Sequence, residues 1–426
     1  MVKAGDKNNR KGNLKGEKRA VVKTPGLLLL YILAFLMASG FAVQSFAAVF
    51  HLSDILNAGP GAVGRATGIQ GLAYLAGCFI FPLVQRRNGL SRDFLILLFA
   101  APLLAGFTFL FYSVSSVAMA TVILAGTGLA TAFLWPPLMG VVSSLAEGSD
   151  LNRVMARYNL SWTLGPVLMP MIAGALYMQG SLFAFSAAAL LFAGGGVIYL
   201  SFFFFRRDVY SRAAGNRESA DKSENESEGL PPEVSDKRVL REYRLGGWIL
   251  LFSESVIMGF LIFILPLSLR ADTGLNEFSV GAVVFARSGI MTAGMWIFGH
   301  LDFWHFNRKT AGLMVGIYVL LLLGMILFHD VVPLYLSLVA LTGIPTAYFY
   351  SSGVFHGVAG ASERSRRMAV SESMITGGMF VGAAFGGTLY QARGIGFTLY
   401  SAGGALLLGA LIAFFVVQKI ELSARK

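Results

Sequence analysis

The side chains best suited to chemistry in this sequence are the few charged ones that interrupt long apolar stretches. Glu254 and Arg287 each stand about eight or nine residues inside such a stretch. At the rise of a helix, Glu254 lies about 12 Å along its segment. Charged groups in these surroundings pair with each other, or they face a cavity where they bind a proton or a charged ligand. Both interpretations stay open: a static ion pair, or a site for ligand binding and coupling.

Amide and aromatic side chains form a second group of candidates. Thr127, Thr131 and Trp135 recur every four residues and therefore share one helix face. Aromatic stripes of this kind pack more often than they bind, so packing stays the alternative. A cavity lined by such residues would suit amphipathic or weakly charged small molecules. The residues considered for it are Gln44, Trp135, Asn159, Trp162, Tyr348 and Tyr350.

No combination of residues indicates an enzyme, so we expect no catalytic residue, no metal and no cofactor. The five His are scattered, and the closest group is His300, Asp302 and His305. The single cysteine, Cys78, cannot form an intrachain disulfide. A nucleotide-binding glycine loop needs a soluble strand, turn and helix, and this context is absent from the sequence.

The composition is that of an integral membrane protein. The chain has 426 residues, of which 55% are hydrophobic and 13% are charged. Average soluble proteins are about 25% charged. The net charge of +11 comes from Lys and Arg between apolar stretches, which suits contact with anionic lipid rather than nucleic acid. We therefore predict an all-α membrane protein.

Twelve stretches are long and apolar enough to cross a bilayer, which takes about 20 residues each. They form two groups of six, separated by the one long polar segment. The predicted spans are 26–50, 62–84, 94–112, 116–144, 154–178, 181–205, 246–269, 278–299, 310–328, 332–358, 367–390 and 395–417.

The basic residues predict how the chain is oriented in the membrane. With a cytoplasmic N-terminus, the cytoplasmic segments hold 29 of the 34 Lys and Arg residues. This bias predicts that both termini are cytoplasmic. The expected units are a disordered basic tail at 1–25, a six-helix bundle at 26–205, a cytoplasmic linker at 206–245, a second bundle at 246–417 and a short tail at 418–426.

The two groups of spans are also repeats of each other. A shift of 213 residues aligns them with 11 identities in the 41 positions from 140 to 180. The same shift places Trp135 opposite Tyr348. Internal repeats of this kind are typical of secondary transporters, in which the site lies near mid-membrane between the repeats.

Twelve spans in two repeats with a long central loop resemble the major facilitator superfamily. Arg87 and Gly89 match the motif of that family between spans 2 and 3, whereas Pro82 and Arg86 depart from it. Gly165-Pro166 is similar to the start of a motif found in its efflux members. The resemblance implies alternating access, with spans 1, 4, 7 and 10 lining the central cavity, which favours Gln44, Trp135, Glu254 and Tyr350.

The family's loop motifs act as a latch on the cytoplasmic side, where charges tie helix ends together. We assign this role to charged residues at the cytoplasmic ends of spans. For Glu372 the alternative is a plain helix-dipole partner in the first turns of its span. The latch residues are Arg87, Asp302, Arg308, Arg153, Arg366 and Glu372.

The sequence thus predicts a monomeric secondary active transporter of the inner membrane, with a small molecule, protons and lipid as its partners. The preferred activity is proton-coupled export of an amphipathic or weakly charged compound. One alternative is uptake of a small metabolite anion held by Arg287. Another is a receptor or assembly protein that has the fold and transports nothing.

Overall fold

The computed structural model describes an α-helical protein. The described residues are 25–85, 89–144, 149–205, 237–359 and 364–424. The helices of the N-terminal half are α1 (Pro25–Asp54), α2 (Pro60–Gln85), α3 (Gly89–Ser113), α4 (Val117–Ala132), α5 (Trp135–Ser144), α6 (Ser149–Gln179) and α7 (Ser181–Phe205). Those of the C-terminal half are α9 (Lys237–Phe263), α10 (Leu265–Thr273), α11 (Glu277–Phe298), α12 (Arg308–Leu327), α13 (Val332–Leu341), α14 (Gly343–Val358) and α15 (Arg364–Ala424).

The helices give the twelve predicted membrane crossings. Among the described residues, ten helical stretches are long and apolar enough to span a membrane. The last of them, Arg367–Val417, holds two crossings, because the chain turns at Gly394 with φ 75°. This left-handed conformation favours glycine. Helix α2 is the remaining crossing and matches the span predicted at 62–84.

Two equivalent crossings of the repeat are broken into shorter helices. In the first half α4 is followed by α5, and in the second half α13 is followed by α14. Pro136, Pro137 and Pro345 stand in the first turn of the second segment of each crossing. Proline is tolerated there because the first N–H groups of a helix have no partner within the helix.

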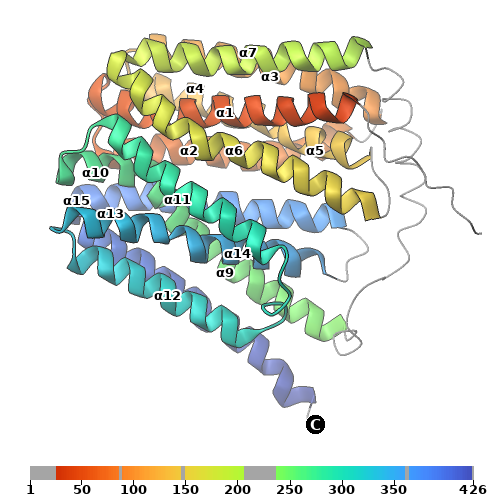
Figure 1. Ribbon diagram of the computed structural model, residues 1–426, viewed down its shortest axis with the longest axis vertical. Helices are drawn as coiled ribbons and strands as arrows, with labels where there is room; N and C mark the ends of the chain where they lie inside the picture. Colours follow the sequence, from red (N-terminus) through yellow and green to blue (C-terminus); the bar gives the residue numbers. More distant parts are fainter. Residues whose placement is uncertain (1–24, 86–88, 145–148, 206–236, 360–363, 425–426) are drawn as a thin grey trace, which may run out of the picture.

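The crossings form two bundles that lie side by side (Figure 1). In the N-terminal half α1 packs against α6 and α7, and α2 packs against α4. In the C-terminal half α9 packs against α15 and α14, and α11 packs against α14. The halves meet along two pairs of helices, α2 with α15 and α6 with α11.

Glycines bring the backbones of the two halves into contact. A Cβ atom on Gly64 of α2 would lie 2.1 Å from the carbonyl oxygen of Ala383 in α15. A Cβ atom on Gly174 of α6 would lie 2.2 Å from the carbonyl oxygen of Glu277 in α11. Only glycine fits at such distances, so both contacts between the halves depend on it.

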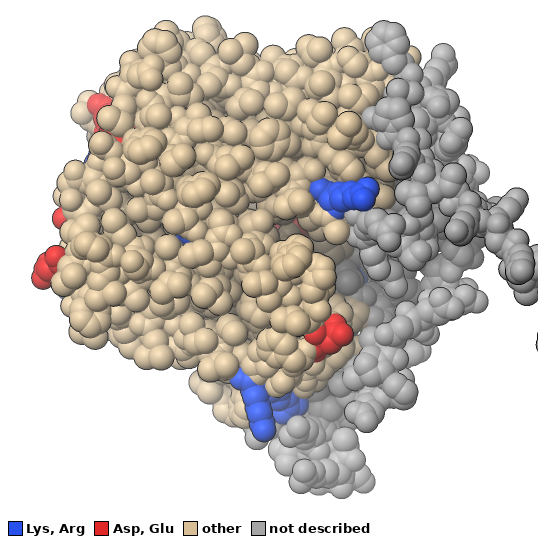
Figure 2. All heavy atoms as spheres, viewed as in Figure 1, with Lys and Arg blue, Asp and Glu red and all other residues tan. Residues whose placement is uncertain are grey.

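The buried core is shared between the halves at only one end. We call it the Asp54 end, because α1 ends there beside the start of α11. One apolar cluster joins Phe50 and Leu52 of α1 with Leu265 and Leu267 of α10. Toward the opposite end, the N-terminal half has a separate cluster of its own. Figure 2 shows the surface hollowed between the halves toward that opposite end.

Charged side chains avoid the middle of the molecular surface. On the face shown in Figure 2 they gather near the two ends and leave a broad uncharged band between them. Many large apolar side chains of the spans are exposed on the surface of the protein, among them Leu190 of α7. A band of this kind fits the hydrocarbon core of a bilayer.

Two predicted boundaries differ from the structure. Helix α9 begins at Lys237, earlier than the predicted start at residue 246, so the end of the expected linker is helical. Helix α15 continues to Ala424, into the expected tail. Basic and polar residues continue a helix beyond the membrane without penalty, and hydropathy does not detect this. The segments 1–24 and 206–236 lie outside the described residues.

The glycine contact between the halves gives the first prediction. Replacing Gly64 with Ala should lower the thermal stability of the purified protein, because a methyl group has no room beside Ala383. Overpacking of this kind typically costs about 1–3 kcal/mol. The measurement is thermal unfolding in detergent.

The matched control is Gly194→Ala in α7, where a Cβ atom would meet nothing within 4 Å. This variant should be unchanged or slightly more stable, since Ala is favoured over Gly in a helix by about 0.5–1 kcal/mol. Equal behaviour of the two variants would contradict the predicted role of Gly64.

Candidate functional site

The structure brings Glu254 and Arg287 into one buried polar cluster inside the C-terminal half. Glu254 lies on α9 and is 1% exposed, and Arg287 lies on α11 and is 4% exposed. The Nε atom of Arg287 donates to the hydroxyl of Thr342 at 3.1 Å, and its Nη2 atom donates to the hydroxyl of Thr346 at 3.3 Å. Tyr318 of α12 shares a hydrogen bond of 3.1 Å with Thr346. Four crossings therefore contribute to the cluster.

The Glu254 carboxyl group makes fewer hydrogen bonds than its oxygen atoms could accept, unlike Arg287, which donates two. Its Oε1 atom is buried and has no hydrogen-bond partner among the described residues. Arg287 and Thr346 are the neighbours that act on this carboxyl group. Among the described residues, no ion pair joins Glu254 to Arg287. A buried acid with a free oxygen and a nearby cation has the groups needed to accept and release a proton.

Tyr318 was not expected in this cluster from the sequence. It lies in a crossing with little else to distinguish it, and it is fully buried. Its position in the middle of the predicted span 310–328 was the only available signal, because a phenol at that depth needs a hydrogen-bond partner. Thr342 and Thr346 stand out as polar residues of the predicted span 332–358. No pattern in the sequence indicates that they contact Arg287.

Gln44 lies in the N-terminal half, away from this cluster. It is fully buried on α1, and its Nε2 atom donates to the hydroxyl of Thr127 on α4 at 3.5 Å. Within the described part of the chain its Oε1 atom has no hydrogen-bond partner, and neither has the Nε2 atom of Gln70 on α2. The N-terminal half therefore also holds buried polar groups with unused hydrogen-bonding capacity.

The two predicted tryptophans belong to the same half. The indole Nε1 atom of Trp162 donates to Oδ1 of Asn159 at 3.2 Å, one turn earlier on α6. Trp162 and Trp135 are both half-buried, and both pack against the separate apolar cluster of the N-terminal half. Asn159 is exposed.

Tyr348 and Tyr350 differ in their surroundings, although only two residues separate them on α14. Tyr348 is buried in the C-terminal half, with ring centroids 5.6 Å from Phe298 and 6.1 Å from Trp304. Tyr350 is half-buried and lies where the charge of Glu372 acts on its hydroxyl. Tyr350 packs against a small apolar cluster of the same half.

The residues predicted for a cytoplasmic latch are only partly described. Asp302 has a side chain that is 92% exposed and lies 3.6 Å from Nδ1 of His305. Burial lowers the pKa of His305, an effect that the Asp302 charge opposes. Arg308 donates to the carbonyl oxygen of Val417 at 3.0 Å. Arg87 and the side chains of Arg153 and Arg366 lie outside the described residues. Glu372 is half-buried on α15.

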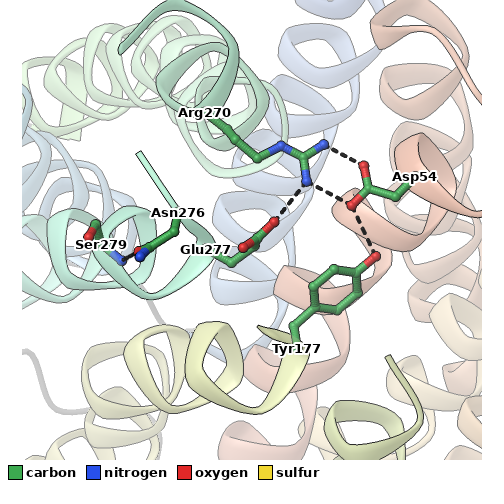
Figure 3. Close-up of polar contacts among 6 residues, drawn as sticks. All are labelled: Asp54, Tyr177, Arg270, Asn276, Glu277 and Ser279. Atoms are coloured by element: carbon green, nitrogen blue, oxygen red, sulfur yellow. Dashed lines mark hydrogen bonds and ion pairs between the residues drawn. The ribbon is translucent and has the colours of Figure 1, made fainter. Parts of the chain in front are cut away.

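A group that the sequence did not reveal joins the halves at the Asp54 end (Figure 3). Arg270 of α10 points its guanidinium at Asp54 of α1 and forms two hydrogen bonds with that carboxylate, one of them 2.7 Å from Nη1 to Oδ2. Nη1 also donates to Oε1 of Glu277 on α11 at 2.9 Å. The Tyr177 hydroxyl of α6 donates to Oδ2 of Asp54 at 3.3 Å. We call these four residues the Asp54 latch.

The charges of this latch reinforce one another. The hydrogen bonds from Arg270 to Asp54, with those to Glu277, raise the pKa of the guanidinium above its ordinary value. The guanidinium also lies 4.8 Å from the centre of the Phe50 ring, where the face of the ring attracts a cation. No spacing in the sequence links residues 54 and 270, because the pairing depends on how the two halves dock.

A second hydrogen bond between the halves lies at the same end. The backbone N–H of Gly61 donates to Oε1 of Gln391 at 2.9 Å. Among the described residues, the hydrogen bonds that cross between the halves are this one and those of Arg270 with Asp54. These polar contacts and the shared apolar core lie at the same end, so together they hold the Asp54 end closed.

A comparison with known protein families decides which class of membrane protein this is. Residues 30–359 match the family model described as Major Facilitator Superfamily. The chain belongs to this superfamily. The resemblance inferred from the sequence is thereby confirmed, as is the expectation that the protein is not an enzyme.

Solved structures of major facilitator proteins have the same fold. A bacterial homologue of the human lysosomal transporter Spinster, inward-facing and unoccupied, superposes with a TM-score of 0.69 at 13% identity, covering 92% of this chain and 96% of its own. The nucleoside transporter NupG gives a TM-score of 0.66 at 11% identity, covering 92% and 99%. A bacterial homologue of ferroportin, inward-facing, gives 0.66 at 14%, covering 92% and 98%. The chain has no significant match among curated protein sequences.

Membership in the superfamily identifies the chain as a secondary transporter that works by alternating access and takes small-molecule substrates. In such a protein two bundles close first one end of a central site and then the other. The shared core and the Asp54 latch identify the Asp54 end as the closed one here. The hollow in Figure 2 lies toward the other end.

The buried cluster gives a prediction for stability. Arg287→Gln should destabilise the protein at a pH where Glu254 is a carboxylate, because that charge is then buried without a neighbouring cation, a loss that typically costs about 3–5 kcal/mol. Adding Glu254→Gln should recover most of this loss. Thermal unfolding of the single and double variants measures the effect, and additive losses in the double variant would refute the coupling.

The Asp54 latch gives a third prediction, which concerns the opening of the Asp54 end. Asp54→Asn should open the Asp54 end in part of the population, because Arg270 loses its charged partner across the halves. Spin labels are attached at Ser115→Cys in the N-terminal half and Leu334→Cys in the C-terminal half, in a chain that also carries Cys78→Ala. Double electron–electron resonance then measures the distance between the halves. A population at longer distance is expected.

The control for this experiment removes a carboxylate that the latch does not use. Asp330 has a fully exposed side chain on the C-terminal half, so Asp330→Asn should leave the distance distribution as in the parent. An unchanged distribution in Asp54→Asn would show that the charge of Asp54 is not needed to hold this end closed.

Proposed function

We propose that this transporter exports an amphipathic or weakly charged small molecule in exchange for protons, with Glu254 as the residue that carries the proton. The observation that carries the proposal is the free Oε1 atom of Glu254, buried beside Arg287 without an ion pair among the described residues. In a fixed structural ion pair, both carboxylate oxygens would be expected to accept hydrogen bonds.

The surroundings of Glu254 allow both protonation states. As a neutral acid it leaves Arg287 on the two threonine hydroxyls, which is the arrangement observed. As a carboxylate it would draw the guanidinium toward itself, because an unpaired charge at this depth is costly. Loading and release of the proton would therefore move Arg287 and the helix that carries it.

The buried cluster is connected to the Asp54 latch through shared helices. Glu254 and Arg270 lie on the successive helices α9 and α10, about 24 Å apart at the rise of a helix. Arg287 and Glu277 both lie on α11, about 15 Å apart. A shift of α11 toward Glu254 would pull Glu277 against Arg270. This geometry supports coupling between the proton and the opening of the Asp54 end.

The predicted orientation is compatible with export. The excess of Lys and Arg predicts that both termini lie in the cytoplasm and the Asp54 end outside, so the described state would be open toward the cytoplasm. An exporter would load its substrate from the cell interior in such a state. Gly165-Pro166, which is similar to the start of a motif found in efflux members, agrees with export.

Uptake of an anion held by Arg287 is less well supported. Two of its nitrogen atoms already donate to threonines, and the side chain is buried within one bundle rather than between the two. We further propose that the protein acts as a monomer in an inner membrane.

The test is flux through proteoliposomes with and without an imposed pH gradient. A mixed panel of drugs, sugars and carboxylates is supplied, and the vesicle contents are read by mass spectrometry. Wild type should move at least one compound against its concentration gradient when protons flow. Glu254→Gln should lose this uphill movement and keep downhill exchange, because the amide cannot carry a proton.

A matched control tests whether the effect is specific to Glu254 or follows from removing any carboxylate. Asp330→Asn removes an exposed acid and should retain uphill movement. Uphill transport that survives in Glu254→Gln would mean that another residue carries the proton.

A further inference from the structure

A pocket opens on the outer side of the C-terminal half, away from the boundary between the halves. Its volume is about 250 Å³, and residues of α9, α12, α14 and α15 line it. Helix α12 packs against α13, α14 and α15, which all belong to the same half. In Figure 1 α12 lies at the edge of the molecule opposite the N-terminal half. The residues that line the pocket do not include Glu254 or Arg287, so it is separate from their buried cluster.

The walls of the pocket are mainly apolar, and part of the lining is exposed at the surface of the protein. Leu250 of α9, Val315 of α12 and Ala413 of α15 contribute to the walls. Gly312 of α12 and Phe414 of α15 also line the pocket, and both are exposed within stretches that can span a membrane. The opening beside them therefore faces lipid. An apolar cavity offers water few hydrogen-bond partners, whereas an acyl chain gains close contacts there.

The polar groups on the α14 side of the pocket bond to the protein itself. The Nε2 atom of His356 accepts from the backbone N–H of Phe306 at 3.2 Å, and its Nδ1 atom shares a hydrogen bond of 3.1 Å with the Ser352 hydroxyl. Because Nε2 accepts, the ring carries its proton on Nδ1 and donates it to Ser352. The His356 ring is then uncharged, so this side of the pocket offers a shape rather than a charge.

A cation stands at the rim of the pocket, where α12 begins. Arg308 is a lining residue, and its Nη2 atom donates to the carbonyl oxygen of Val417 on α15 at 3.0 Å. The central carbon of its guanidinium lies 5.9 Å from the centre of the Tyr243 ring on α9. These contacts place the positive charge across the rim, between α9 and α15. Arginine is suited to phosphate because of its charge and the geometry of its N–H groups.

The rim lies at the end of the protein that favours anionic lipid. Before the pocket, α9 carries Arg241 and Arg244, with Glu242 as the acid between them. Val417 follows the turn at Gly394, so the rim lies toward the end opposite the Asp54 end. The excess of Lys and Arg predicts that this end is cytoplasmic, where the leaflet carries anionic headgroups. Apolar walls with a cation at the rim thus complement the two parts of a phospholipid.

We propose that this pocket binds one acyl chain of an anionic phospholipid, with Arg308 on the headgroup phosphate. The chain enters beside Gly312 and Phe414 and fills the space between α9, α12 and α15. Pockets for drug-sized ligands usually measure about 300–1,000 Å³, which is larger than this one. An acyl chain is thin and needs only part of its length enclosed. The occupant is therefore a lipid that stays with one bundle, distinct from the transported compound.

The first test compares two phospholipids with the same chains and different headgroup charge. Dioleoylphosphatidylglycerol is anionic, and dioleoylphosphatidylcholine carries no net charge. Each is titrated into the purified full chain in detergent, and native mass spectrometry measures the bound fraction. The anionic lipid should bind about tenfold more tightly or better, and Arg308→Gln should remove most of this preference. The matched control is Lys309→Gln, which removes an exposed neighbouring cation outside the pocket lining and should retain the preference.

The second test fills the pocket from its own wall. A Cβ atom on Gly312 would meet nothing within 4 Å, so Gly312→Phe can occupy the opening without displacing the backbone. This variant should bind dioleoylphosphatidylglycerol at least about tenfold more weakly than wild type, because the chain loses its place. The matched control is Gly316→Phe, one turn farther along α12, where a Cβ atom also meets nothing within 4 Å and the residue does not line the pocket. It should bind as wild type does.

Thermal unfolding verifies that each variant is folded. Undiminished lipid binding in folded Gly312→Phe, or an equal loss in Gly316→Phe, would overturn the pocket as the binding site. Equal affinity for the two lipids, or a preference that survives Arg308→Gln, would overturn the assignment of the headgroup to Arg308. Binding of neither lipid would reject a phospholipid as the occupant. All of these measurements are made without transport, so they are independent of the proposed proton route.

Discussion

The two halves of this transporter touch where glycine allows one backbone to lie against another, and the rest of the structure depends on that contact. Gly64 on α2 and Gly174 on α6 have no space for a side chain, and each faces a carbonyl group of the other half. Such contacts are tight but carry no interlocking side chains, so two bundles can meet there and separate again. The charged latch of Asp54 and Arg270 then adds a polar contact that favours the closed arrangement of that end.

The same helices carry the closing contacts and the buried charges. Helix α11 holds Glu277 at its start and Arg287 in its middle, and α9 with α10 holds Glu254 and Arg270. A rigid helix transmits a displacement along its axis, and the interior of a packed bundle has few alternative arrangements. Under the proposed mechanism, the chemistry inside the C-terminal half would therefore be linked to the Asp54 end through helices of that half.

The sequence was sufficient for the fold and for part of the site. Hydropathy, the charge bias and the repeat predicted twelve crossings in two bundles, because these signals depend on the membrane rather than on detailed packing. Glu254 and Arg287 stood out for the same reason, as charges are rare at that depth. Tyr318, Thr346 and the partnership of Asp54 with Arg270 depend on how distant crossings dock, and no single-sequence pattern encodes this. The early start of α9 was missed because its first turns are polar.

The proposed role of Glu254 depends on what stands next to it. Arg287 lies in the same bundle and acts on the Glu254 carboxyl group, while its own hydrogen bonds go to Thr342 and Thr346. A nearby cation suits a residue that exchanges protons, because the charged form is then tolerated as well as the neutral one. An acid at this depth without such a neighbour would be held in its neutral form and would not release its proton.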